Sequence, residues 1–181
     1  VGLMEYALIT HDFSVKYVSE VGSTTTPLSF TIVSLWSSLD GSILLWAAIL
    51  ASWSAVFAWQ SKGNHPGHSS YALGVILLVG VFFTVLVSSV ANPFELVANP
   101  PAEGPGPNPL LQNHVLMIIH PPALYLGYVG MTMPFGMGCA ALLAGRMPTS
   151  WARSTRRWML IPWGCLSMGI ILGAWWSYEV L

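Results

Sequence analysis

The chain has 181 residues, of which 54% are hydrophobic and 7% charged, and its mean hydropathy is positive. This composition excludes a soluble globular domain and is typical of an integral membrane protein. A formal net charge of −1 and the lack of a basic run argue against nucleic acid as a partner. Cys139 and Cys165 lie in apolar runs without a Cys-x-x-Cys spacing, so we interpret them as packing residues.

The apolar runs predict an all-α fold, a polytopic transmembrane helical bundle with about four full spans and a partial N-terminal one. Residues 1–10 are expected to form the last turns of a membrane helix. The full spans are expected at residues 42–60, 71–91, 114–145 and 158–177, since crossing the hydrocarbon core takes about 20 apolar residues. Residues 1–181 are thus interpreted as a single integral-membrane region.

The segments between the spans are predicted to alternate between the two sides of the membrane. Residues 11–41 are expected to form a polar loop and an interfacial segment, and the proline-rich residues 92–113 an irregular loop. The short loops 61–70 and 146–157 hold most of the basic residues: Lys62, Arg146, Arg153, Arg156 and Arg157. Because basic loops stay on the cytoplasmic side, these two loops are predicted to be cytoplasmic and the other two periplasmic.

His120 is the one histidine set into an otherwise apolar run, and Pro121 and Pro122 follow it directly. Proline is tolerated mainly in the first turn of a helix, so a helix is expected to start or kink here. His120 would then lie at the external mouth of a span, where imidazole can face solvent or an iron atom.

Further along, Pro134 should free the carbonyl of Gly130 and bend the helix. Four glycines are expected to permit close helix contacts: Gly127, Gly130, Gly136 and Gly138.

The other candidate ligands are interpreted as structural. His114 lies six residues before His120, a spacing that does not share one face of a straight helix, so it is expected at a helix entry or in a loop. Asp40 is expected to cap a helix start. The remaining histidines are expected to be exposed to solvent: His11, His65 and His68. Three methionines are expected to pack in the core: Met131, Met133 and Met137.

Four motifs, in this order along the chain, resemble the CcmF family, the haem-lyase subunits of System I cytochrome c maturation. They are Trp36-x-x-x-Asp40-Gly41-Ser42 with Trp46, Asn108-Pro-Leu-Leu-Gln112, His120-Pro-Pro-Ala-Leu-Tyr-Leu-Gly-Tyr-Val-Gly130 and Leu172-Gly-Ala-Trp-Trp-Ser-Tyr178. The resemblance covers essentially the whole chain and implies the N-terminal part of a longer haem-handling protein. The family usually has glutamate where this chain has Asp40, which keeps the charge.

The resemblance implies a protein that binds haem b on the periplasmic face and passes it from the haem chaperone CcmE to the thiols of apocytochrome c. It also implies CcmH/CcmI-type partner subunits, and a bacterial inner membrane or, for an organellar protein, a mitochondrial one. His120 would be an axial ligand of the haem iron, and residues 178–181 would begin a tryptophan-rich segment. The other implied haem-binding residues are Pro121, Pro122, Tyr125, Trp175, Trp176 and Tyr178. Trp36, Asp40, Gly41 and Trp46 are interpreted as a structural family motif.

The chemistry of these residues is consistent with haem, because haem iron takes imidazole as an axial ligand and large aromatic rings stack on a flat porphyrin. This part of the sequence alone is not expected to be an active lyase, and no catalytic residue can be named. A paralogue of the NrfE type would look the same here. The alternative function is a membrane transporter or structural subunit, including haem export, with His120 structural and the tryptophans forming an interfacial belt.

Overall fold

The computed structural model describes residues 1–62, 66–109, 114–145, 147 and 149–180. Within these residues the fold is all-helical, as predicted, and the β-type pairing is limited to one isolated bridge between Val15 and Leu96. Four helical segments are long and apolar enough to cross a membrane: Leu39–Gln60, Gly67–Ser88, Leu116–Ala144 and Trp151–Glu179. The prediction of about four full spans is therefore confirmed.

The N-terminal part forms a small cluster of short helices, α1 (Gly2–Ile9), α2 (Lys16–Val21), α3 (Leu28–Val33) and the 3-10 turn η1 (Ser34–Trp36). The expectation of a purely polar loop after residue 10 is wrong, because α2 buries Tyr17, Val18 and Val21. These apolar side chains recur at helical spacing among polar neighbours, and they pack on Met4 and Leu8 of α1.

The first two candidate spans are α4 (Leu39–Gln60) and α5 (Pro66–Ser88), and both begin earlier than predicted. The N-cap position of α4 is Ser38, so Asp40 lies inside the first turn instead of capping it. Its carboxylate still lies where the helix dipole favours a negative charge. Pro66 stands at the first helical position of α5, where its missing N–H costs nothing, and the helix therefore takes residues 66–70 from the expected loop.

The third span is divided into α7 (Leu116–Gly130) and α8 (Thr132–Ala144), with Met131 between them. This division agrees with the predicted effect of Pro134, which leaves the carbonyl of Gly130 without its helical donor. Of the predicted start or kink at the two prolines, a start is wrong, because α7 begins at Leu116 and contains both. This beginning lies two residues after residue 114, where the span is expected to start. Gly145 ends α8 with a φ of 62°, the left-handed conformation that glycine adopts without strain.

The last helix, α9 (Trp151–Val180), begins seven residues before the expected start at Trp158. Arg153, Arg156 and Arg157 therefore lie on its first turns and not in a loop, whereas Arg146 lies outside the described residues. Over 30 residues the helix is about 45 Å long, which exceeds the about 30 Å of the hydrocarbon core. Its basic start can thus extend beyond the apolar layer.

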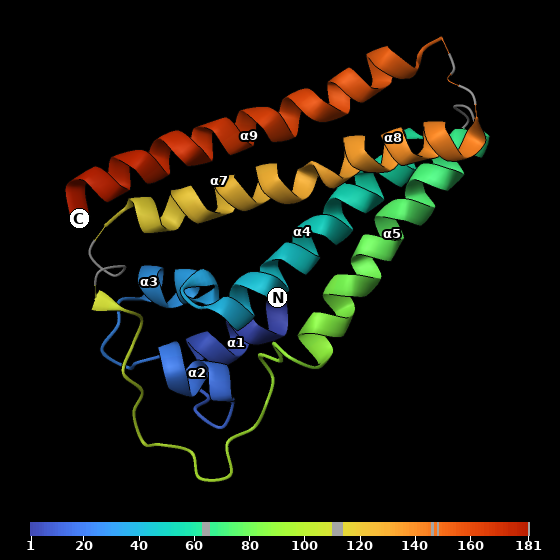
Figure 1. Cartoon of the computed structure of the whole chain (residues 1–181). Coiled ribbons are helices and arrows are strands. Elements are labelled where there is room, and N and C mark those ends of the chain that lie inside the picture. Colours follow the sequence, from blue (N-terminus) through green and yellow to red (C-terminus); the bar gives the residue numbers. More distant parts are fainter. Residues whose placement is uncertain (63–65, 110–113, 146, 148, 181) are drawn as a thin grey trace.

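The helices α7 and α9 lie side by side and antiparallel, and α4 and α5 form a second antiparallel pair beneath them (Figure 1). A core of apolar side chains joins α4, α5, α7 and α8: Ile49, Leu50, Phe57, Ala72, Ile76, Val129, Met133 and Ala140. Met133 is fully buried in this core and Met137 packs against it, which confirms the packing interpretation for these two of the three methionines. Gly136 lets α8 approach α5, since a Cβ there would lie 2.8 Å from Ile76 Cγ1. Gly138 has no atom within 4 Å of such a Cβ, so its predicted close contact is wrong.

The proline-rich segment up to residue 109 is irregular, as predicted, but it is fastened to the N-terminal cluster. Backbone hydrogen bonds join Lys16 N to Glu95 O (2.8 Å), Val97 N to Ser14 O (2.9 Å) and Gly106 N to Gly22 O (3.0 Å). These bonds satisfy backbone groups that a free loop would leave to water. The loop and the cluster therefore form one external layer next to the bundle.

Two of the histidines expected to be exposed are half-buried instead. His11 follows α1, two residues after Ile9, and has a φ of 53°. Its Nδ1 is buried with no hydrogen-bond partner among the described residues. His68 lies in the first turns of α5 and is half-buried. His65 lies outside the described residues. The two cysteines are free and half-buried, in line with a packing role.

Candidate functional site

His120 is the fifth residue of α7 and turns its ring toward α9. Its Nδ1 lies 2.7 Å from the carbonyl oxygen of Gly169. A carbonyl can only accept a hydrogen bond, so Nδ1 must carry the proton and donate it. The neutral ring then has its lone pair on Nε2, which is the atom a neutral imidazole offers to a metal.

The space for this ring is created by Gly173, one helical turn beyond Gly169. A Cβ at position 173 would lie 2.5 Å from Cε1 and 3.0 Å from Nδ1 of His120. Real side chains essentially never approach so closely, so the imidazole rests directly on the backbone of α9. The ring is held by a hydrogen bond on one side and by the glycine on the other.

Trp176 lies against two imidazole rings. It meets His120 edge-on, with ring centroids 5.7 Å apart, and it stacks on His114 at 6.5 Å with an interplanar angle of 17°. Its Nε1 is buried and has no hydrogen-bond partner among the described residues. An unpaired buried donor is costly, so this N–H is poised for an acceptor that the described residues do not supply.

His114 directly precedes α7, as predicted, but it belongs to the same constellation as His120. Its Nδ1 accepts the backbone N–H of Leu116 at 3.2 Å, and its Nε2 lies 2.5 Å from Oε2 of Glu179. The other carboxylate oxygen of Glu179 accepts the Nε1–H of Trp175 at 2.5 Å. One carboxylate thus orients an imidazole and an indole.

Sequence reasoning missed both His114 and Glu179 as members of this site. The six-residue spacing from His120 counts against His114 only if both residues lie on one helix, whereas His114 reaches Trp176 from outside α7. Glu179 could have been noticed, because it follows Trp175 by one helical turn and is the one carboxylate between residues 104 and 181.

The other predicted haem-binding residues are distributed over different surfaces. Tyr125 faces α4, where its hydroxyl lies 3.2 Å from Ser42 Oγ and its ring contacts Trp46 at 5.2 Å. Tyr178 is 89% exposed. Pro121 is buried and Pro122 half-buried in α7. The structure therefore brings His120 together with Trp176, and it places Tyr125 elsewhere.

The family-motif residues near the start of α4 hold this end of the bundle together. Trp36 Nε1 donates to the carbonyl of Met117 at 2.9 Å. That carbonyl lacks its normal helical donor because residue 121 is proline. A Cβ on Gly41 would lie 2.0 Å from the carbonyl oxygen of Leu35, so only glycine allows this approach. These contacts fix the first turns of α7, from which His120 projects.

The ring of Trp46 extends this contact between α4 and α7. It packs against Tyr125 and Tyr128, with ring centroids 5.2 and 5.6 Å apart, and against Phe83 of α5 at 6.2 Å. Its Nε1 is buried without a partner among the described residues, so Trp46 acts through packing.

Comparison with known proteins identifies relatives in one family. The family model described as cytochrome C assembly protein matches residues 36–181. The chain is 38% identical over 181 residues to the cytochrome c-type biogenesis protein CcmF of Pseudomonas fluorescens, covering 99% of this chain and 27% of that protein. It is also 38% identical over 181 residues to the cytochrome c-type biogenesis protein NrfE of Haemophilus influenzae, covering 100% of this chain and 28% of that protein.

A solved structure of a cytochrome c heme lyase CcmF is similar in fold, with a TM-score of 0.77 and 37% sequence identity. The alignment covers 96% of this chain and 27% of that chain. The chain thus spans about a quarter of the length of these relatives, and the matched part includes both α7 and α9.

Proposed function

Because the chain belongs to the cytochrome c assembly protein family, we propose that its α7–α9 face holds haem while the haem is joined to a cytochrome c. The observation that carries the proposal is the position of His120, whose proton is fixed on Nδ1 by Gly169 beside the ring of Trp176. An imidazole so oriented presents Nε2 as an axial ligand for haem iron.

The residues present fit a haem group in two respects. The unpaired Nε1–H of Trp176 is a donor for an acceptor such as a propionate. Trp175 is 53% exposed and adds an open indole surface on which a flat porphyrin can lie. His120 would hold the iron, Trp176 would border the ring, and Glu179 would keep His114 and Trp175 in place.

The proposed sidedness follows from the basic residues. Lys62, Arg153, Arg156 and Arg157 lie at the ends of α4 and α9 remote from His120. With that end in the cytoplasm, the His120 face lies on the periplasmic side of a bacterial inner membrane, or on the equivalent side of a mitochondrial one. Haem b held there is accessible to periplasmic partners.

The proposed activity is that of a haem lyase within a larger complex. Haem would arrive from the chaperone CcmE, and CcmH/CcmI-type subunits would present the apocytochrome. Each cysteine thiol of the apocytochrome adds across one haem vinyl group, so no leaving group is required and no cysteine of this chain takes part. The task of these residues is to position haem and coordinate its iron.

The test replaces His120 by alanine in the full-length protein that contains this chain. We expect the purified variant in detergent to lose haem from this site, and the loss to be reversed by added imidazole, which restores the missing ligand. Haem content, the reduced absorption spectrum and cytochrome c maturation in cells are the three readouts. Unchanged values for all three would return His120 to a purely structural role.

A suitable control is His11→Asn. His11 follows α1, and its ring lies beside Phe13, with ring centroids 6.2 Å apart. Asparagine tolerates its positive φ, so the backbone is preserved. The control is expected to keep its haem, which would separate loss of a ligand from loss of a histidine.

A further inference from the structure

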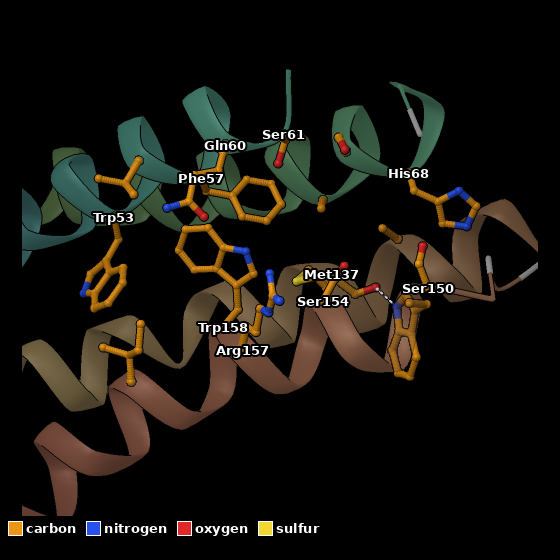
Figure 2. A pocket seen from close by; sticks show the side chains of 16 residues that line it. Trp53, Phe57, Gln60, Ser61, His68, Met137, Ser150, Ser154, Arg157 and Trp158 are labelled. Carbon is orange, nitrogen blue, oxygen red and sulfur yellow. Dashed lines mark hydrogen bonds between the residues drawn. The ribbon is translucent and has the colours of Figure 1, made fainter. Parts of the chain in front are cut away.

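A cavity of about 290 Å³ lies at the end of the bundle remote from His120, between α4, α5, α8 and the start of α9 (Figure 2). Its apolar wall is formed by the rings of Trp53, Phe57 and Trp158. Trp158 meets Trp53 at 6.0 Å and Phe57 at 5.1 Å between ring centroids, both edge-on. Trp151 closes the wall by donating its Nε1–H to the carbonyl of Met137 at 3.2 Å.

The rim of the cavity carries Arg157 together with the hydroxyl of Ser154, both from α9. Arg157 forms no salt bridge with any residue in the described part of the chain. Arg157 is exposed, and its guanidinium can bind an anion beside the apolar wall, since it offers planar donors that match phosphate and carboxylate.

The distribution of charge along the chain excludes a carboxylate of these residues as that anion. All seven acidic residues lie outside residues 41–94 and 104–178, while five of the six lysines and arginines lie within those ranges. The end of the bundle around the cavity is therefore basic and free of acidic side chains. An anion bound there must come from another molecule or segment.

The depth of Arg157 in the membrane points to a lipid. Arg157 and Glu179 are separated by about 33 Å along α9, at 1.5 Å per residue, which is close to the about 30 Å thickness of the hydrocarbon core. With Glu179 at one boundary, Arg157 lies at the opposite one, where the phosphates of that leaflet are. The aromatic wall continues from there toward the apolar layer.

We propose that this cavity binds the head group of an anionic phospholipid from the leaflet on the basic side. The phosphate lies against Arg157 and Ser154, and the first carbons of the lipid lie along Trp53, Phe57 and Trp158. A volume of about 290 Å³ is at the lower end for small-molecule sites, so it takes the head group and leaves the acyl chains in the bilayer. The proposal does not depend on haem binding.

The test compares Arg157→Gln with Arg153→Gln in the full-length protein, reconstituted in nanodiscs that contain phosphatidylglycerol and phosphatidylcholine. Arg153 is a basic residue one helical turn before Arg157 on α9, but it does not line the cavity. It is therefore a matched control. Native mass spectrometry counts the phosphatidylglycerol molecules that stay bound. We expect roughly a tenfold weaker retention for Arg157→Gln, the loss of one charge-assisted hydrogen bond, and near-normal retention for the control.

A second variant, Ser154→Phe, fills the cavity while keeping every basic residue. It should lose the lipid as Arg157→Gln does, which would show that the cavity and not only the charge is required. Added inorganic phosphate should not displace the lipid. Equal retention by all variants, displacement by phosphate alone, or no lipid bound to the unmodified protein would each overturn the proposal.

Discussion

The carbonyl of Met117 illustrates how a single hydrogen bond shapes the His120 end of the molecule. Pro121 has no N–H for this carbonyl, and the indole of Trp36 replaces it at 2.9 Å. Two residues that are 85 positions apart in the sequence thus complement each other. Pro121 is tolerated inside α7 because the side chain of Trp36, from η1, donates the hydrogen bond that the Met117 carbonyl would otherwise lack.

We predict that Trp36→Phe destabilises the protein by about 1–3 kcal/mol, because it leaves a buried carbonyl without a donor. Adding Pro121→Ala restores a backbone N–H to that carbonyl, so the double variant should regain most of the loss. Thermal unfolding of the purified protein in detergent measures all three variants. Strict additivity of the two substitutions would contradict this account.

Trp46→Phe provides a matched control for this experiment. The Nε1 of Trp46 is buried but has no partner among the described residues, so removing it should cost no hydrogen bond. An equal loss of stability in both tryptophan variants would mean that ring packing, and not the bond to Met117, is responsible.

At the scale of single residues, the sequence singles out His120 but not the residues around it. The histidine could be found because it interrupts an apolar run before two prolines. Its partner Gly169 could not, since a backbone carbonyl carries no signature in the sequence. The six-residue spacing argues against His114 only for one straight helix, and that condition fails because α7 begins at Leu116. The apolar contacts of Tyr125 with α4 likewise depend on helix rotation, which spacing alone does not reveal.

The pairing of α7 with α9 is organised by glycines that alternate with larger side chains. A Cβ on Gly127 would lie 2.3 Å from Leu166 N, one on Gly169 2.7 Å from Leu124 N, and one on Gly173 2.5 Å from the His120 ring. In these three contacts the residue number on α7 falls from 127 to 124 to 120, while the residue number on α9 rises from 166 to 169 to 173. This antiparallel register brings the backbones close enough for the imidazole to reach a carbonyl.

We predict that Gly173→Ala reduces haem binding without removing any ligand. The new methyl group would overlap the His120 ring, which must then rotate away from Gly169 at a cost of about 1–3 kcal/mol. Haem content and the thermal unfolding midpoint are the readouts. Gly164→Ala is the control, because a Cβ there meets nothing within 4 Å and should be neutral or stabilising. Similar behaviour of the two variants would refute the proposed role of Gly173.

The helices themselves could be predicted from apolar run length, but their limits could not. Helices α4, α5 and α9 begin before their apolar runs, because polar and basic residues such as Arg153 and Arg156 form helix readily. α2 was hidden for a related reason, since a six-residue helix with three buried side chains has too short a pattern to stand out from a polar stretch. In α2 and at the start of α9, the local composition favours a loop, but the segment is helical in the folded chain.

On the scale of the whole molecule, the chain divides into a bundle and an external layer that is held by carboxylates. Glu103 accepts hydrogen bonds from the backbone N–H of Thr24, at 2.9 Å, and from its hydroxyl. These bonds to Thr24 lower the pKa of Glu103 to about 2. They tie the proline-rich loop to the segment after α2.

We predict that this attachment weakens in acid. The pKa of Glu103 is lower in the folded protein than the ordinary value of 4.5, so its stabilising effect is complete above pH 4.5 and is lost as the pH falls toward 2. Glu103→Gln should reproduce the acid state at neutral pH. Hydrogen exchange at the Thr24 amide, corrected for the intrinsic rate, measures the effect.

Glu95→Gln is the comparison for this prediction. It removes the exposed ion pair with Lys16, at 2.8 Å, but leaves the backbone bonds of this part of the loop intact. Because exposed ion pairs contribute little, protection at Thr24 should stay near that of the unmodified protein. Equal loss of protection in the two variants would show that net charge, and not the geometry of Glu103, holds the loop.

The antiparallel pairing of α7 and α9 also bears on the order of events during biosynthesis. His114, His120, Trp175, Trp176 and Glu179 all belong to one helical hairpin, so the whole constellation lies within 66 consecutive residues. A hairpin of neighbouring helices closes faster than an arrangement assembled from distant parts of a chain. Once the ribosome has released α9 into the translocon, the two helices can enter the bilayer already paired, with the imidazole in place before maturation of the protein is complete.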